Sequence, residues 1–169
     1  MVRPVHAFSL MLDTTEVSEI MSRRIVATKQ NVAIESLILL LVDEAIGAVP
    51  VVDDDHRPIG MVSKSDLVFD DYEWAELRDE TFCLKRVAKL PKGLETEGDL
   101  YLAELLQSRT VGDIMSGEPI TVTPHTRVVE AARLMAERRV HGCPVVGADG
   151  RVVAMVTTFD IARWVASHA

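Results

Sequence analysis

The sequence contains 169 residues, of which 48% are hydrophobic and 26% are charged, and its formal net charge at pH 7 is −8. This composition is typical of a soluble globular protein with one compact domain or two small ones. The negative charge argues against nucleic acid as the main partner, because such binding depends largely on lysine and arginine side chains that neutralise phosphates. No apolar stretch approaches the length of a membrane-spanning helix, so a membrane is not an expected partner either.

The N-terminal segment and the cysteines bear on the cellular compartment. Residues 5–12 are mostly apolar and follow Arg3, but they lack a clear small-residue cleavage site. We interpret residues 1–14 as a loose tail or docking segment rather than a signal peptide. Cys83 and Cys143 lie in different parts of the sequence and imply no disulfide framework. The predicted location is therefore cytoplasmic.

The first predicted elements are a short helix, a strand and a longer helix. Residues 13–21 begin with capping residues and acidic charge, which favours a short helix, and residues 25–28 are rich in β-branched side chains, which suits a strand. The helix predicted at 35–44 contains six consecutive apolar residues, Leu37 to Val42, which cannot all lie on one stripe of a surface helix. It is either an ordinary core helix or a helix that packs on its own sheet and also on a second copy, within the chain or in another chain.

A hairpin and a long connection follow. Residues 48–52 read as a buried strand, 53–56 as a turn and 59–62 as the returning strand. Residues 70–109 have a different character, with acidic, aromatic and basic clusters interrupted at Pro91. This segment is either an inserted helical arm or a partner-docking or lid segment, and the sequence does not separate these alternatives.

The second half predicts a similar order of elements. Residues 131–137 are amphipathic with one apolar face. The Asp149-Gly150 pair between two valine-rich strands is a strong hairpin signal, because it tolerates the positive φ of a tight turn. Each half thus pairs a helix with a β-hairpin, and the predicted class is α+β, or mixed α/β, with a small sheet in each half.

The two halves are copies of one unit. Val17-Ser18-Glu19-Ile20-Met21-Ser22 returns as Val111-Gly112-Asp113-Ile114-Met115-Ser116, Pro50-Val51-Val52 returns at 144–146, and the stretch from Met61 to Asp66 returns at 155–160. The offsets from 17 to 111, from 50 to 144 and from 61 to 155 are all 94 residues, so the chain is an internal duplication.

These motifs resemble a known family. An I-M-S segment, a threonine-containing strand, a helix, a P-V-V strand, a hairpin and a strand that ends in S/T-x-x-D are typical of the cystathionine-β-synthase (CBS) domain, here as a tandem pair or Bateman module. The resemblance implies two CBS repeats related by pseudo-two-fold symmetry, each a small β-sheet flanked by helices. The predicted organisation is a tail (1–14), repeat one (15–69), a helical linker arm (70–109) and repeat two (110–169).

The pattern Ser63-x-x-Asp66, repeated as Thr157-x-x-Asp160, has two interpretations. It is a variant of the capping box, in which a hydroxyl caps a helix and a carboxylate three residues on reaches back to the cap amide. The same helix N-terminus can also hold an anion such as a nucleotide phosphate, while the carboxylate accepts hydrogen bonds from ribose hydroxyls.

The resemblance favours the second interpretation. In CBS domains this motif forms the ribose and phosphate site, which implies those roles for Ser63, Asp66, Thr157 and Asp160. The family also places adenine against the strand after I-M-S and against the residues before P-V-V. The implied adenine-binding residues are Ile25, Val26, Ala48 and Val49 in repeat one, and Ile120, Thr121, Gly142 and Cys143 in repeat two.

Three further side chains could contact phosphate. His141 lies three residues before Pro144, a position from which related domains reach phosphate, whereas its counterpart in repeat one is Gly47. Lys64 could supply positive charge in repeat one, and Arg163 in repeat two. The two sites are therefore not expected to be equivalent, and one or both could be occupied. His141-Gly142-Cys143 lacks the second His/Cys pair of a tetrahedral metal site, so no metal is predicted.

The sequence thus predicts a stand-alone CBS pair that binds an adenine nucleotide, with AMP ahead of ADP and ATP, in clefts between the repeats. Such a protein would be a regulatory sensor rather than an enzyme, with no cofactor beyond this ligand, acting as a homodimer on an unidentified protein effector. The alternatives are an interaction module whose boxes only cap helices, and a regulator that binds S-adenosylmethionine. An enzyme is a further alternative, disfavoured because no nucleophile with a base is identifiable.

Overall fold

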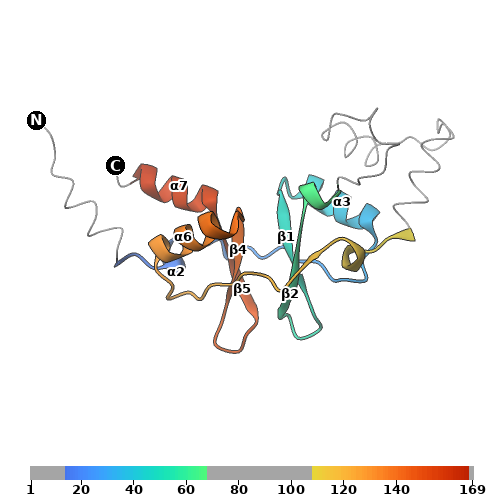
Figure 1. The fold of residues 1–169 in the computed structure, drawn as a ribbon, viewed down its shortest axis with the longest axis horizontal. Coiled ribbons are helices and arrows are strands. Elements are labelled where there is room, and N and C mark those ends of the chain that lie inside the picture. The colour runs from blue at the N-terminus through green and yellow to red at the C-terminus, as the bar shows by residue number, and fades with distance from the viewer. Residues whose placement is uncertain (1–13, 68–107, 168–169) are drawn as a thin grey trace, which may run out of the picture. The chain divides into compact units, whose positions relative to one another are not determined.

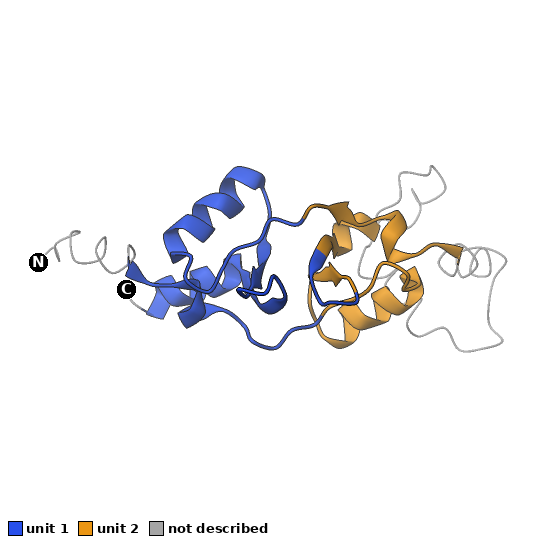
Figure 2. Ribbon diagram, turned by 90° about the horizontal axis from the view of Figure 1, so that it is seen from below, with its two compact units in different colours: residues 1–26, 54–58, 119–169 blue, residues 27–53, 59–118 orange. Residues whose placement is uncertain are grey.

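The computed structural model describes residues 14–67 and 108–167, which fall into two compact units (Figure 2). Within these ranges, unit 1 contains residues 14–26, 54–58 and 119–167, and unit 2 contains residues 27–53, 59–67 and 108–118. Almost all of the predicted N-terminal tail, almost all of the predicted linker arm and Cys83 lie outside the described residues. Each unit combines helices with a small antiparallel sheet, which confirms the predicted mixed class (Figure 1).

Unit 2 is built around a three-stranded sheet in the order β1-β2-β3. Its strands are β1 (Ala48–Val52), β2 (Pro58–Ser63) and β3 (Ser116–Gly117), and its helices are α3 (Ile34–Asp43) and the 3₁₀ helices η1 (Lys64–Leu67) and η3 (Val111–Asp113). The predicted strand at 25–28 is wrong in extent, because only Thr28 pairs, in a single parallel bridge to Val51. Residues 23–27 form no bridge to any strand of the described part of the chain, and the chain passes from one unit to the other between residues 26 and 27.

The apolar helix α3 forms much of the core of unit 2. Ile34, Leu37, Ile38 and Leu41 are buried, whereas Leu39 is 37% exposed. The apolar run therefore fills the core with one face and leaves apolar surface on the other among the described residues. That surface is compatible with either of the alternatives that the sequence left open.

Unit 1 pairs two strands with three helices. Its elements are α2 (Val17–Ile20), α6 (Val128–Arg138), β4 (Gly142–Val146), β5 (Val152–Thr157) and α7 (Thr158–Ser167). The predicted hairpin is confirmed: β4 and β5 are antiparallel with Pro144 opposite Met155, and Gly150 in the turn has a φ of +79°. The amphipathic prediction for residues 131–137 is also confirmed, because α6 buries Val128, Ala131 and Met135. Cys143, Val145, Val156 and Trp164 complete this core.

Each repeat contributes its first helical turn to the unit that contains most of the other repeat. In unit 1, the Val17 amide donates to the Thr126 carbonyl (2.8 Å) and the Ser18 amide to the Pro124 carbonyl (2.9 Å). In return, the Val128 amide donates to the Thr15 carbonyl (2.9 Å). These bonds fix α2 on the segment that leads into α6.

Unit 2 contains the same three bonds, displaced by the repeat offset. The Val111 and Gly112 amides donate to the carbonyls of Val32 and Gln30, both at 2.8 Å, and the Ile34 amide donates to the Arg109 carbonyl at 3.1 Å. Unsatisfied backbone groups are costly to bury, so these exchanged bonds are integral to both cores. The sequence repeats and the compact units are therefore different divisions of the same chain.

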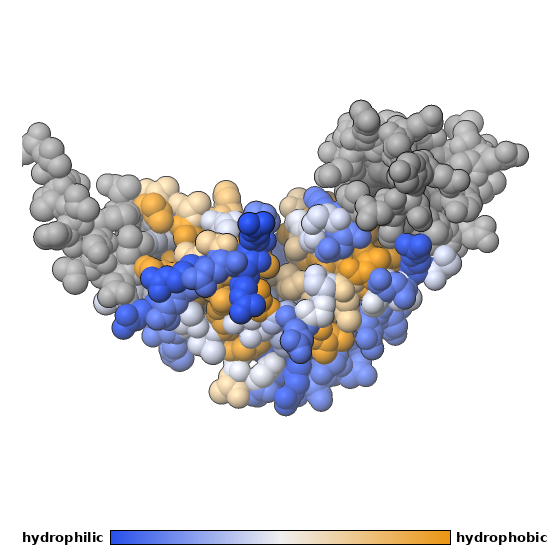
Figure 3. Space-filling model, viewed as in Figure 1, coloured by the Kyte–Doolittle hydropathy of each residue, from blue (hydrophilic) through white to orange (hydrophobic). Residues whose placement is uncertain are grey.

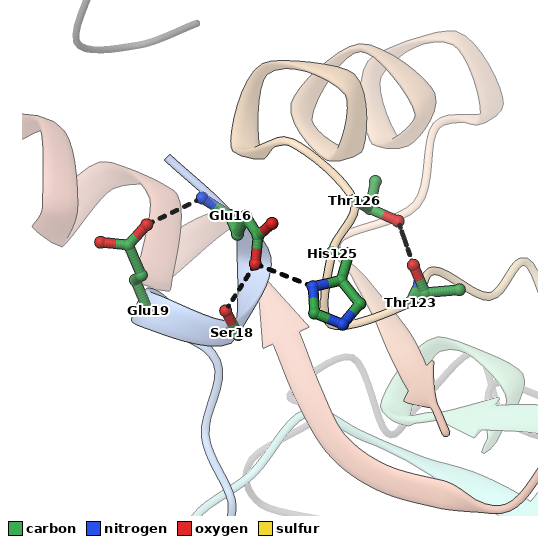
Figure 4. Close-up of polar contacts among 6 residues, drawn as sticks. All are labelled: Glu16, Ser18, Glu19, Thr123, His125 and Thr126. Carbon is green, nitrogen blue, oxygen red and sulfur yellow. Dashed lines mark hydrogen bonds and ion pairs between the residues drawn. The ribbon is translucent and has the colours of Figure 1, made fainter. Parts of the chain in front are cut away.

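Side chains strengthen the α2 junction in unit 1. Glu16 Oε2 accepts a hydrogen bond from Ser18 Oγ (3.3 Å) and lies 3.0 Å from His125 Nδ1, while the Glu16 amide donates to Glu19 Oε1 at 3.0 Å (Figure 4). Thr123 and Thr126 are linked through their hydroxyls at 3.1 Å on the same loop. Glu16, one of the capping residues predicted at the start of this helix, thus also contacts His125, which lies 109 residues further along the chain.

Gly60 of β2 allows β3 to approach closely. Gly60 pairs with Gly117, and a Cβ at Gly60 would lie 2.6 Å from the Ser116 carbonyl oxygen and 2.9 Å from Met115 Sδ. The Ser116 carbonyl belongs to the backbone and cannot move aside as a flexible side chain can. The pairing of β2 with β3 therefore requires glycine at position 60. In repeat two the counterpart is Ala154, which is fully buried, and the corresponding pairing is the single bridge between Ser22 and Met155.

Replacing Gly60 with alanine should therefore destabilise the protein by about 2 kcal/mol, because β3 must move away from β2. The matched control is Gly117→Ala, where an added Cβ meets nothing within 4 Å and φ is not positive. The free energy of unfolding is measured by urea denaturation of both variants. Equal stability of the two variants would contradict the close approach of β3.

Cys143 provides a test of the unit 1 core. Its side chain is fully buried, and desolvation raises the pKa of the thiol to about 11. In a Cys83→Ser background, Cys143 should remain unmodified by 5,5′-dithiobis(2-nitrobenzoic acid) at pH 8, because the reactive thiolate is scarce and inaccessible. Addition of denaturant should expose one thiol per chain. Rapid modification of the folded protein would show that β4 is not packed as described.

Candidate functional site

The first candidate box lies where β2 meets η1 in unit 2. Asp66 Oδ2 accepts hydrogen bonds from both the amide and the hydroxyl of Ser63, each at 2.7 Å. The Ser63 hydroxyl also lies 2.8 Å from Ser65 Oγ. Asp66 and Lys64 are half-buried, and no described residue bonds to Asp66 Oδ1. The predicted capping geometry is thus present, and Oδ1 has no bonding partner among the described residues.

The second candidate box lies where β5 meets α7 in unit 1. Asp160 Oδ2 accepts from the Thr157 amide (2.9 Å) and hydroxyl (2.6 Å), and the Asp160 amide lies 3.3 Å from the same hydroxyl. Asp160 Oδ1 accepts from Arg163 Nη2 at 2.9 Å. Asp160 is only 6% exposed, so the carboxylate is buried and both of its oxygens are bonded.

The chain contains a third box of the same geometry at the start of η3. Asp113 Oδ2 accepts from the Thr110 amide (2.7 Å) and hydroxyl (2.8 Å). These two hydrogen bonds, the amide first, hold the pKa of the Asp113 carboxyl below its ordinary value. Asp113 is exposed and does not follow the second strand of a hairpin, unlike Asp66 and Asp160. The hydrogen bonds alone therefore do not distinguish a ligand site from a helix cap.

Backbone pairing brings several of the predicted residues together within each unit. In unit 1, Gly142 lies opposite Thr157, and the His141 carbonyl accepts from the Thr158 amide at 2.9 Å. In unit 2, the Gly47 carbonyl accepts the equivalent bond from the Lys64 amide, also at 2.9 Å. The residues before each P-V-V strand therefore lie directly beside the box of the same repeat.

The predicted adenine-binding residues differ in accessibility. Ile25 and Ala48 are exposed, and Val26, Ile120, Thr121 and Gly142 are half-buried. Val49 and Cys143 are buried, so their backbone rather than their side chains would be available to a ligand. The segment 120–122 runs beside β4 through a parallel bridge between Val122 and Val145. Ile25 and Val26 belong to unit 1 and Ala48 and Val49 to unit 2.

An open groove of about 380 Å³ lies on unit 1 between α6 and α7. Figure 3 shows apolar surface over α7 beside a hydrophilic strip over α6. The groove includes exposed His141 but none of the other predicted binding residues. It is lined by Ala132, Met135, Ala136, Arg139, Val140, His141, Thr158 and Ile161.

One exposed residue at the second box was not singled out from the sequence. Phe159 lies between Thr157 and Asp160 and is 70% exposed, with the Arg163 guanidinium carbon 5.9 Å from the centre of its ring. The signal that could have identified Phe159 is an aromatic residue at an exposed position in the first turn of α7.

No group of three or more His, Cys, Asp or Glu residues within 14–67 and 108–167 is arranged to hold a metal ion. In the same ranges no helix combines the length and the apolar character that crossing a membrane would require.

Comparison with known proteins agrees with this architecture. The family model described as CBS domain matches residues 17–70 and 111–167. The curated relative CBSX2, a chloroplastic CBS domain-containing protein of Arabidopsis thaliana, is 29% identical over 136 residues, which cover 80% of this chain and 56% of CBSX2. The chain thus spans little more than half the length of that relative.

Solved CBS pairs share the fold. The structure of Arabidopsis CBSX2 in complex with AMP is 25% identical with a TM-score of 0.65, and the match covers 90% of this chain and 97% of that chain. The CBS domain pair of protein MJ0100, solved with 5′-methylthioadenosine and S-adenosyl-L-methionine, is 22% identical with a TM-score of 0.66, covering 92% and 99%. With two matched segments that make up most of its length, each containing a strand followed by an S/T-x-x-D box, this chain belongs to the CBS-domain family as a tandem pair.

Proposed function

We propose that this CBS pair is a regulatory module that binds an adenosine ligand, with AMP as the ligand, at its two S/T-x-x-D boxes. The observation that carries the proposal is the buried Asp160 carboxylate at the start of α7, directly beside the residues that precede the P-V-V strand. Support also comes from CBSX2, a relative whose solved complex contains AMP.

The chemistry of each box suits a nucleoside phosphate. A carboxylate accepts hydrogen bonds from both ribose hydroxyls, which is how acidic residues bind ribose in dinucleotide folds. The first turn of α7 presents amide groups and the positive end of the helix dipole to an anion. The small residues Gly47 and Gly142 beside the boxes leave backbone groups accessible to an adenine edge.

We propose a regulator rather than an enzyme. The described cysteine is buried with a raised pKa, and no described nucleophile is paired with a base and a third, orienting group. A regulator acts through a change in population of states that a partner recognises, so the module requires a protein effector. A cytoplasmic location remains a prediction, and the relative CBSX2 is described as chloroplastic.

A purely structural interaction module is the second candidate. The observation that favours it is the box of Thr110 and Asp113, which has the same hydrogen bonds at a site where the family implies no ligand. If Ser63 and Thr157 also act only as caps, the chain will bind no adenine compound.

Titration calorimetry with AMP, ADP, ATP, adenosine and S-adenosylmethionine separates the two candidates. Asp66→Asn or Asp160→Asn should weaken AMP binding at the altered box by about tenfold or more, because a charge-assisted acceptor for the ribose hydroxyls is lost there. Asp113→Asn is the matched control, since it alters a box of the same geometry, and should leave AMP affinity unchanged. Absence of saturable binding to any compound by the wild-type protein would favour the structural module.

We also propose that the chain forms a homodimer through the outer face of α3. Leu39 is exposed there although Leu37, Ile38 and Leu41 are buried. Leu39→Lys should shift the protein towards monomer in sedimentation velocity, because a charge would be buried at the interface. Glu137→Lys, at an exposed position of α6 and so outside the proposed interface, is the control and should remain dimeric. A monomeric wild-type protein at high concentration would refute the dimer.

A further inference from the structure

The two boxes differ in the state of their carboxylates. Both use Oδ2 to bind the hydroxyl and amide of the capping residue. In repeat two, Oδ1 of Asp160 is also bonded, to Arg163 at 2.9 Å, whereas no described residue bonds to Oδ1 of Asp66. Among the described residues, a cation is therefore bonded to the carboxylate of the repeat-two box and not to that of the repeat-one box.

Arg163 is held at this position from two sides. It lies one turn after Asp160 on α7, forms the ion pair with it, and lies over the ring of Phe159 at 5.9 Å. Its side chain is nevertheless 63% exposed, so the remaining guanidinium N–H groups face solvent. A guanidinium has five N–H donors, of which the hydrogen bond to Asp160 Oδ1 uses one. The arginine is thus preorganised and still able to bind a second anion.

The arginine has no counterpart in repeat one. The repeat offset of 94 residues relates position 163 to position 69, which is phenylalanine in the sequence. The difference between the boxes is therefore encoded in the sequence.

We propose that Arg163 determines the ligand specificity of the repeat-two site, selecting phosphorylated adenosine ligands against uncharged adenosine and against cationic S-adenosylmethionine. This inference rests on the proposed function, since it assigns a ligand class to one of the two boxes.

The selection follows from competition for Asp160. A ribose hydroxyl that bonds to Oδ1 must displace or share the Arg163 hydrogen bond. A phosphorylated ligand compensates for this loss, because its phosphate can accept a bidentate, charge-assisted pair from the guanidinium. Adenosine offers no such acceptor. S-adenosylmethionine has one carboxylate, but its sulfonium and ammonium groups give it a net positive charge, which is unfavourable close to the Arg163 guanidinium.

The test uses an Asp66→Asn background, so that binding reports repeat two alone. AMP, adenosine and S-adenosylmethionine are titrated calorimetrically into this protein and into versions that also carry Arg163→Gln or Arg163→Lys. Glutamine can still donate a hydrogen bond to Asp160 but carries no charge. Lysine keeps the charge but loses the planar, bidentate donor set. Arg133→Gln, at an exposed arginine of α6, is the control for net charge.

The expected result is a change in selectivity. Arg163→Gln should weaken AMP binding by about tenfold while leaving adenosine binding unchanged or stronger, and should improve the relative affinity for S-adenosylmethionine. The AMP affinity of the Arg163→Lys protein should fall between that of the Asp66→Asn parent and that of the Arg163→Gln protein. The Arg133→Gln protein should bind AMP as tightly as the parent. Thermal unfolding of the ligand-free variants confirms that α7 is intact.

Other outcomes overturn the inference in distinguishable ways. An equal loss of AMP and adenosine binding in Arg163→Gln would mean that the arginine only positions Asp160, and the proposed function would stand. Loss of all binding in Asp66→Asn, with binding by the wild-type protein, would mean that repeat two takes no ligand. Absence of binding by the wild-type protein to every compound would overturn the inference and the proposed function together.

Discussion

The structure depends on the exchange of one helical turn between the two repeats. A segment of three or four residues such as α2 or η3 cannot be stable alone, because helix nucleation is costly and most of its amides have no partner within the turn. The carbonyls that accept from Val17 and Ser18 belong to the second repeat, and those that accept from Val111 and Gly112 belong to the first. Neither core is complete without a segment of the other repeat, so the duplicated chain needs both copies to satisfy its own backbone.

Duplication has not made the two units identical, and single residues account for the differences. Gly60 lets β3 form a two-pair ladder with β2, whereas buried Ala154 occurs where only one bridge, from Ser22 to Met155, is made. Similarly, Arg163 bonds to the carboxylate of one box only. The duplicated unit thus carries two chemically different boxes, and the differences follow from side-chain size and charge rather than from a change of fold.

The elements that the sequence predicted correctly are those with local signals. The Asp149-Gly150 turn requires a positive φ, and the spacing of Val128, Ala131 and Met135 marks one buried face of α6. The boxes were also predictable, because their hydrogen bonds join residues only three apart. The exchange of α2 and η3 between the repeats was not predictable. Apolar spacing shows that α2 buries one face, but it does not show which repeat covers that face. The predicted strand at 25–28 failed for the same reason, as β-branched residues indicate a strand only where a neighbouring strand exists.

Capping and ligand binding need not exclude each other, because they use different oxygens of the same carboxylate. In both candidate boxes the cap occupies Oδ2, and Oδ1 is the atom on which the boxes differ. Exposed Asp113 needs no further partner, since water satisfies its second oxygen at little cost. Asp160 is buried, and a buried carboxylate is stable only when its remaining lone pairs are bonded. Arg163 fills that requirement, and under the proposed specificity a ligand that replaced it would have to satisfy both the carboxylate and the displaced guanidinium.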